Sequence, residues 1–400
     1  MNPRRLGLVL LAMLAFTMVL SACGADPEQV EVIVTKIVTE IQQQEIEVPV
    51  EVTRVVEMIQ TRMVVEEVEV PAEVMALGSA DKPIKVLFVP SVDVDTIVAG
   101  GQMVADGLKA ATGLEYEVSV PTSYAATIEE MCASPDDTIG FIPAQGYVLA
   151  NDRCGVTVGG AAVRFGLAWY AAQIVVRSDS GIETLEDLNG KTWGIPDFGS
   201  TSGYLFPLAM FQAAGIEPGE VIETGGHTNA MLALYNGDVD FATAFFSPPL
   251  LPNNARQWTY GVDDPEIWRE AGVSPIRNEE GRTFVAGGPS EGGYRILDAR
   301  SSVTDTAPDI FDVTKILALT DQIPNDSLSF GPEFPLNTAL LIVNALEEWV
   351  TLDNPDCVAS LCSEEFYNWT GVDPTTDGFY DAVRFLMEQM GITEEEVLGG

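Results

Sequence analysis

The run Ile84-Lys85-Val86-Leu87-Phe88-Val89 opens a regular alternation of strand and helix patterns. Its largely apolar, β-branched character predicts a buried strand. Helical spacing follows over residues 97–112 and ends at Gly113, which suits a left-handed helix cap. The pattern then continues with a strand, a helix and a strand at residues 116–120, 124–131 and 138–141. This half of the chain therefore has the order β-α-β-α-β.

The same alternation returns further along the chain. Strands are predicted at residues 170–176, 192–195 and 239–245, and helices at residues 185–188, 202–214 and 231–236. Strands that alternate with helices usually pair in parallel, and the helices cover both faces of the sheet. We therefore expect an α/β protein of two lobes, each built around a parallel sheet.

Composition excludes several functions. The 400 residues include 60 Asp and Glu against 20 Lys and Arg, a formal net charge of −40 at pH 7. A protein that binds DNA or RNA needs a basic surface, so we expect no nucleic-acid partner. The single His excludes a metal centre of several imidazoles, and there is no CxxC motif, so we expect neither a metal nor a cofactor. Ligand binding, or chemistry carried by carboxylates, remains.

The N-terminal residues have the pattern of a processing signal. Two arginines precede an apolar run over residues 6–20 that is short for a membrane span. The following Leu20-Ser21-Ala22-Cys23 resembles the bacterial lipobox. This resemblance implies a lipoprotein signal peptide at residues 1–22 and acyl chains on Cys23, which would anchor the protein outside the cytoplasmic membrane. The alternative is an ordinary secretory signal with a chance Cys.

Residues 23–80 differ in composition from the rest of the chain, being rich in Val, Ile and Glu. Between residues 26 and 80 there are 12 acidic side chains and three basic ones, so this stretch should stay solvated. Its β-branched residues, Pro49 and Pro71 argue against a long helix, although a β-branched coiled coil is an alternative. We expect an acidic, mostly extended tether between the membrane anchor and the globular part.

Four cysteines remain after Cys23, and an even number in an exported protein favours disulfides. They are Cys132, Cys154, Cys357 and Cys362. Three connectivities are possible, and the one that joins neighbours in sequence pairs Cys132 with Cys154 and Cys357 with Cys362. Free thiols are the alternative.

Six short segments carry a family resemblance. They are Ser123-Tyr124-Ala125-Ala126, Phe141-Ile142-Pro143-Ala144-Gln145-Gly146-Tyr147-Val148-Leu149-Ala150, Asp197-Phe198-Gly199-Ser200-Thr201-Ser202-Gly203-Tyr204, Gly225-Gly226-His227, Asn236-Gly237-Asp238-Val239-Asp240 and Ile323-Pro324-Asn325-Asp326. Together they resemble the PhnD-like receptors of ABC importers, which bind phosphate, phosphite or phosphonate. The order and spacing of the segments agree across both lobes.

This resemblance implies the two-lobed type II periplasmic-binding fold. Lobe 1 would comprise residues 84–169 and 325–400, and lobe 2 residues 170–324. The chain would cross between the lobes near residues 168–171 and 323–326, so that a hinge can close around a ligand. The expected partners are a small anion, an ABC permease and the membrane through the lipid anchor.

The stretch Ser200-Thr201-Ser202-Gly203 lies where a helix is predicted to begin. Hydroxyl groups, unpaired backbone N–H groups and the helix dipole would together bind an oxyanion. The simpler interpretation is a Ser N-cap that binds nothing. Three hydroxyls exceed what a cap needs, and the resemblance favours the anion site.

The resemblance also assigns binding roles to Tyr124, Tyr147 and His227. A phenol donates a hydrogen bond without adding charge, and its ring covers a carbon substituent. The imidazole would contact ligand oxygens as donor or acceptor, according to its protonation. The alternative for Tyr124 and Tyr147 is packing in the core or on the surface. The alternative for His227 is an exposed loop residue that binds nothing.

One position departs from the family pattern. Many relatives carry an Asp where this chain has Phe245, and such a carboxylate favours a ligand oxygen that still bears a proton. Without it, the cleft is expected to offer mainly donors, including an imidazolium at His227. Affinity should then rise as the ligand loses its second proton.

Two other functions were weighed. Gly199-Ser200-Thr201-Ser202-Gly203 superficially resembles the nucleophile elbow of serine hydrolases, with His227 as base, but its central residue is Thr201. We therefore expect no enzyme. A lipoprotein that senses a small anion, including a sulfonate, would need the same closing cleft and remains open.

Overall fold

The computed structural model describes residues 30–46, 54–70, 76–279, 281–363, 365–392 and 397. The chain divides into two compact units, Met1–Ala76 and Leu77–Gly400. In the first unit, β1 (Val30–Ile46) pairs antiparallel with β2 (Arg54–Val70). The predicted signal peptide and Cys23 lie outside the described residues, and the role of this segment as a tether stays a prediction.

The larger unit contains two six-stranded sheets, and the first has the order β17-β6-β16-β5-β3-β4. Its strands are β3 (Ile84–Phe88), β4 (Tyr116–Ser119), β5 (Thr138–Ile142), β6 (Thr157–Val163), β16 (Ser327–Phe330) and β17 (Gly371–Pro374). The β3 strand is parallel to β4 and β5, as the alternation predicts. However, β16 is antiparallel to both β5 and β6, so this sheet is mixed. The prediction of purely parallel sheets is wrong because the chain returns from the second sheet to insert β16.

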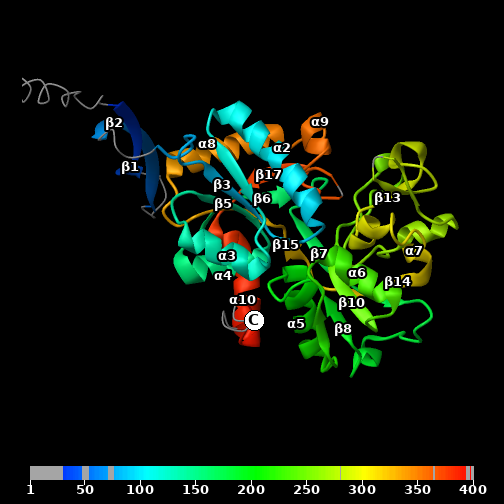
Figure 1. Cartoon of the computed structure of the whole chain (residues 1–400). Helices are drawn as coiled ribbons and strands as arrows, with labels where there is room; N and C mark the ends of the chain where they lie inside the picture. Colours follow the sequence, from blue (N-terminus) through cyan, green and yellow to red (C-terminus); the bar gives the residue numbers. More distant parts are fainter. Residues whose placement is uncertain are drawn as a thin grey trace, which may run out of the picture. The chain divides into compact units, whose positions relative to one another are not determined.

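Helices cover both faces of this first sheet (Figure 1). They are α2 (Val94–Thr112), α3 (Tyr124–Ala133), α4 (Ala144–Cys154), α8 (Leu336–Trp349), α9 (Pro355–Val358) and α10 (Asp381–Met390). The α2 helix contacts α8 and α9, whereas α4 contacts α3 and α10. Between them, the fully buried rings of Phe88 and Phe141 stack with centroids 4.7 Å apart.

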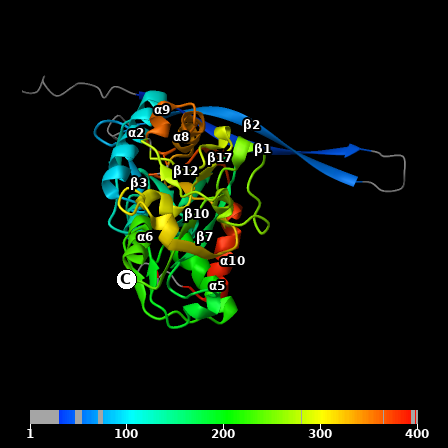
Figure 2. The same cartoon turned by 90° about the vertical axis from the view of Figure 1, so that its right-hand side faces the viewer.

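The second sheet has the order β14-β7-β10-β8-β9, with β15 also paired to β7. Its strands are β7 (Trp169–Arg177), β8 (Trp193–Ile195), β9 (Val221–Glu223), β10 (Phe241–Phe246), β14 (Thr314–Leu319) and β15 (Ile323–Pro324). The β8, β9 and β10 strands are parallel, whereas β7 is antiparallel to β10 and β14. Figure 2 shows β7 and β10 with α5 (Phe206–Ala214) and α6 (His227–Asn236) beside them.

The remaining elements complete this half of the unit. They are α7 (Ile310–Val313) and a three-stranded antiparallel sheet of β11 (Ile276–Arg277), β12 (Thr283–Val285) and β13 (Tyr294–Ile296). The helix predicted over residues 202–214 is two elements, a π-helical turn η2 (Thr201–Leu205) followed by α5. Pro207 lies in the first turn of α5, where its missing N–H group costs little.

The chain crosses between the two sheets twice. The first crossing joins β6 to β7, and the second joins β15 to β16. The crossings lie side by side, because Ile323 pairs with Tyr170 and the Asn325 N–H donates to the Ala168 carbonyl at 3.1 Å. The sheet to which each strand belongs supports our proposal that lobe 1 comprises residues 84–169 and 325–400 and lobe 2 residues 170–324.

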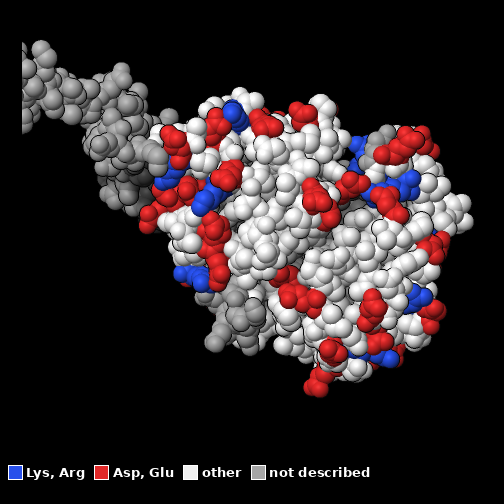
Figure 3. Space-filling view, viewed as in Figure 1, with Lys and Arg blue, Asp and Glu red and all other residues white. Residues whose placement is uncertain are grey.

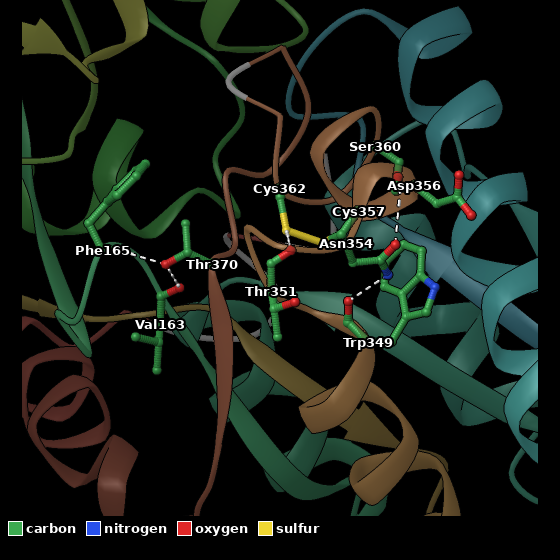
Figure 4. Close-up of a disulfide and its surroundings, with 10 residues drawn as sticks. All are labelled: Val163, Phe165, Trp349, Thr351, Asn354, Asp356, Cys357, Ser360, Cys362 and Thr370. Atoms are coloured by element: carbon green, nitrogen blue, oxygen red, sulfur yellow. Dashed lines mark hydrogen bonds between the residues drawn. A yellow bond between two sulfur atoms is a disulfide. The ribbon is translucent and has the colours of Figure 1, made fainter. Parts of the chain in front are cut away.

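Both predicted disulfides are confirmed. Cys132 in α3 is joined to Cys154 at the end of α4. Cys357 in α9 is joined to Cys362, as shown in Figure 4. Beside it, the Asn354 side chain donates to the Trp349 carbonyl at 2.8 Å and thereby connects α8 to α9. Each disulfide therefore fixes a local connection within the first sheet's helical layers.

The longer disulfide loop should contribute more to stability. Replacing Cys132 and Cys154 with Ala opens a loop with a sequence separation of 22 residues. The chain-entropy model gives a loss of about 3 kcal/mol in the free energy of unfolding. Opening the Cys357–Cys362 loop, with a separation of 5, should cost about 2 kcal/mol. Denaturant unfolding of both double variants measures the difference; a larger loss for the shorter loop would contradict it.

Candidate functional site

A small hollow lies between the two sheets, and residues of both sheets and their connections form its wall. The space open to the centres of water molecules is about 60 Å³. The apolar part of the wall includes Val89, Val92, Phe141, Phe245, Leu297 and Phe366. A hollow of this size suits a ligand of few atoms, because pockets for drug-sized molecules are several times larger.

Two of the predicted hydroxyl residues, Ser200 and Ser202, lie in this wall. Ser200 also caps η2, since its Oγ accepts a hydrogen bond from the Gly203 N–H at 3.0 Å. Thr201 is not in the wall, and its Oγ1 accepts from the Gln145 N–H of α4 at 2.8 Å. Gly203 has a packing role, because a Cβ there would lie 2.0 Å from Pro196 Cγ.

The two predicted phenols have different places. Tyr124 is buried and lies in the wall. Tyr147 does not line the hollow; its hydroxyl donates to Asp377 at 2.8 Å and its ring packs on Tyr380. The structure therefore brings together Tyr124, Ser200, Ser202 and His227 in the wall of the hollow. Tyr147, Thr201 and Gly203 are not part of that wall.

Two further phenols, Tyr170 and Tyr367, line the hollow and were missed from the sequence. Burial raises the pKa of the Tyr170 phenol, while hydrogen bonding with the Ser202 and Thr201 hydroxyls acts in the opposite direction. The Tyr367 hydroxyl donates to the Val89 carbonyl at 2.8 Å. Tyr170 is the second residue of β7, at a chain crossing, and this position is the signal that could have indicated it.

His227 begins α6 after two glycines, and its side chain is buried in the wall. Its backbone N–H donates at 2.9 Å to the carbonyl of Ser91, which lines the hollow from the side of the first sheet. Burial, together with the positive charge of Arg164, lowers the pKa of His227 to about 3. The expectation of an imidazolium is therefore wrong, because a buried imidazole beside a guanidinium stays neutral. Its ring meets Phe245 edge-on at 5.1 Å.

Three charged side chains in the wall were also missed: Arg164, Asp298 and Asp326. Arg164 follows β6 and donates to Asn325 at 2.7 Å and to Asp326 at 2.5 Å. The two carboxylates correct the expectation of a cleft that offers mainly donors. Asp326 ends a segment that carried the family resemblance, whereas nothing in the local sequence singles out Arg164.

Asp197 does not line the hollow, but its hydrogen bonds join the segment before η2 to the start of α3. Its carboxylate accepts from the Gly199 N–H at 2.6 Å and from the Tyr124 N–H at 3.2 Å. Burial raises the pKa of Asp197 to about 6, although these two hydrogen bonds act in the opposite direction. Together with the Gln145–Thr201 contact, it closes the two lobes around the hollow.

A model of the family "ABC transporter, phosphonate, periplasmic substrate-binding protein" matches residues 86–349. The chain belongs to this family. A curated relative of this binding protein is the phosphate-import protein PhnD of Mycolicibacterium smegmatis, which is 30% identical over 151 residues. That match covers 34% of this chain and 47% of the relative, so the chain spans about half the length of its relative.

Solved structures confirm the type II periplasmic-binding fold of this binding protein. A binding protein of an ABC phosphonate transporter from Pseudomonas aeruginosa has a TM-score of 0.56 at 17% identity, covering 76% of this chain and 85% of its own. PhnD1 from Prochlorococcus marinus in complex with methylphosphonate has a TM-score of 0.56 at 11% identity, covering 78% of this chain and 98% of its own.

The raised pKa of Asp197 makes stability depend on pH. The folded protein holds this proton more tightly than the unfolded chain, so the contribution of Asp197 favours folding at low pH. That contribution is lost as pH rises from about 4, the unfolded pKa, to about 6, and amounts to about 3 kcal/mol. The free energy of unfolding of the wild type, minus that of Asp197→Asn, should therefore fall by this amount between pH 4 and pH 7.

Denaturant unfolding at several pH values measures this difference. Asp238 is exposed, so Asp238→Asn is a matched control that should show a difference from the wild type that varies little with pH. A pH-independent difference for Asp197→Asn would contradict this prediction, because it would mean that the pKa of Asp197 is the same in the folded and the unfolded protein.

Proposed function

We propose that this binding protein captures a small phosphorus oxyanion, namely phosphonate, phosphite or phosphate, between its lobes and delivers it to an ABC importer. The observation that carries the proposal is the small hollow that Ser200 and Ser202, at the start of η2, line together with Tyr124 and Arg164 from the other sheet's side. These groups are hydrogen-bond donors that converge on a space suited to few atoms.

The available donors suffice for useful affinity. A hydrogen bond to a charged group contributes about 1.5 to 3 kcal/mol, and micromolar binding needs about 8 kcal/mol, so about four to six such bonds are enough after the cost of closure. Hydroxyls and phenols of the wall, the Arg164 guanidinium and backbone N–H groups of η2 together supply that number.

The acidic surface does not prevent capture of an anion. Figure 3 shows Asp and Glu side chains spread over the visible face, with Lys and Arg among them. Charges on the surface are screened within about 8 Å at physiological ionic strength, whereas donors in the hollow act at contact distance. We expect slower association rather than loss of binding.

The ligands of the relatives support this ligand class. PhnD1 was solved with methylphosphonate, and the mycobacterial relative is a phosphate importer. The family consists of transport proteins rather than enzymes. A hydrolase also receives no support from the site, because Thr201 lies outside the wall and accepts a hydrogen bond from Gln145. The family supports delivery to a permease rather than sensing.

The two phenols predicted to bind ligand provide a matched test. Titration calorimetry of the wild type with phosphate, phosphite, methylphosphonate, aminoethylphosphonate and sulfate should find micromolar or tighter binding of at least one phosphorus anion. For that anion, Tyr124→Phe should weaken binding about tenfold to a hundredfold, because it removes a donor to a charged group.

Tyr147→Phe is the control for this substitution. It removes the hydrogen bond to Asp377, so it should cost about 1 kcal/mol in the free energy of unfolding and leave ligand affinity unchanged. If no phosphorus anion binds, the proposed function is wrong. If Tyr147→Phe weakens binding as much as Tyr124→Phe, the site lies elsewhere.

We also propose that the mature protein is held at the outer face of the cytoplasmic membrane through acyl chains on Cys23. In the part of the chain that the structure describes, no helix is both long and apolar enough to cross a membrane. Expressed in bacteria fed labelled palmitate, the wild type should carry label and sediment with membranes, whereas Cys23→Ala should do neither. Label retained by the variant would contradict the assignment.

A further inference from the structure

The ion pair of Arg164 and Asp326 joins the two chain crossings and also forms part of the ligand hollow. Arg164 lies just after β6, and Asp326 lies between β15 and β16, 162 residues further along the chain. Their side chains are 11% and 17% exposed, although the pair has no other charged partner among the ion pairs of the described residues. Both residues line the hollow.

Both members of the pair have hydrogen-bonding capacity left for a ligand. Arg164 donates through Nε to the Tyr367 carbonyl, through Nη1 to Asn325 and through Nη2 to Asp326. Within the described residues this uses three of the five N–H groups of a guanidinium. The Asp326 carboxylate accepts from Arg164 through Oδ2, and a carboxylate has about four acceptor positions.

The other charge-bearing groups of the wall are neutral or paired. Asp298 is bound by the fully buried Arg300 through two hydrogen bonds of 3.0 and 2.9 Å. The other end of that guanidinium meets Glu266 at 2.6 Å. His227 is neutral, because burial and the charge of Arg164 lower its pKa to about 3. Among the described wall residues, Asp326 is therefore the carboxylate whose ion-pair partner, Arg164, also lines the ligand hollow.

Four phenols surround Asp326 and keep their protons. Burial first, and then the negative charge of Asp326, raises the pKa of Tyr170, Tyr367 and Tyr380. Burial and the charge of Asp197 raise the pKa of Tyr124, to which Asp326 adds. Since the phenols and the imidazole stay neutral, the protonation state of a bound ligand is decided mainly between the ligand and the ion pair.

A carboxylate accepts hydrogen bonds and cannot donate them. It repels a fully deprotonated oxygen, whereas it binds an oxygen that carries a proton. A guanidinium has the opposite preference and binds the charged oxygen. A pair of the two, presented to one hollow, therefore fits an anion that has both a charged oxygen and a P–OH group.

We propose that Asp326 is the specificity-determining residue that selects a singly protonated phosphorus anion by accepting its P–OH hydrogen bond, while Arg164 binds a charged oxygen of the same ligand. The proposal rests on the function proposed above and adds the protonation state of the ligand. The acceptor comes from the second chain crossing, where Asp326 lies between β15 and β16.

The test compares the wild type, Asp326→Asn and Asp353→Asn by titration calorimetry with inorganic phosphate, methylphosphonate and sulfate from pH 5.5 to 8.5. Asn keeps an acceptor for Arg164 and removes the charge. Asp353 is exposed and outside the wall, so its variant controls for the change in net charge. Asp197, whose pKa burial raises to about 6, is present in all three proteins, so comparison at each pH removes its effect.

The wild type should bind phosphate and methylphosphonate more weakly as pH rises and these ligands lose their second proton, which falls within the range titrated. It should bind sulfate, which has no proton to donate, at least tenfold more weakly than phosphate at every pH. In Asp326→Asn the fall with pH should disappear, and sulfate should gain about tenfold to a hundredfold in affinity. Asp353→Asn should match the wild type.

Two results would overturn the proposal. The first is wild-type affinity for phosphate that rises across this pH range, and the second is sulfate bound as tightly as phosphate; neither depends on the variant being folded. A folded Asp326→Asn with the wild-type pH profile would overturn it as well. If the wild type binds none of phosphate, phosphite, methylphosphonate and aminoethylphosphonate, the proposed function is wrong too. If it binds a phosphorus anion but shows either result above, only the selectivity proposal is wrong.

Discussion

One guanidinium fixes the hinge of this protein. Arg164 is largely buried, and a buried charge is stable only when it is paired and hydrogen-bonded. Its partners are the Tyr367 carbonyl, Asn325 and Asp326. Since Asn325 and Asp326 lie where the chain returns from the second sheet to the first, the same contacts hold both crossings in register. The two walls of the ligand hollow are positioned relative to each other by this cluster.

A second buried guanidinium, that of Arg300, holds a turn in the second half of the unit in place. Arg300 is fully buried between Asp298 and Glu266 and lies in the short 3-10 turn η6 (Ala299–Val303). These ion pairs fix the turn that presents Leu297 and Ser301 to the hollow. The part of the wall that this turn contributes is therefore positioned by buried ion pairs.

A local pattern predicted Ser200 and Ser202 at the start of a helix, whereas the role of His227 came from the family resemblance. Ser200, Ser202 and His227 line the hollow because a helix mouth or a Gly-rich turn places them at its edge. Tyr147 is different, since the family resemblance indicates a position in α4 and not the direction of its side chain. That direction is set by packing on Tyr380 and by the hydrogen bond to Asp377, both from the C-terminal part of the chain.

The alternation of strands and helices, the two local disulfides and the hydroxyl-rich turn could be predicted from the order of residues, because periodicity and short spacing reflect local geometry. The insertion of β16, the Arg164–Asp326 pair and the neutrality of His227 could not. Strand pairing across the hinge and the pairing of residues 162 positions apart depend on contacts between distant parts of the chain. Burial, which moves the His227 pKa, is likewise a property of the packed lobes and has no counterpart in the local sequence.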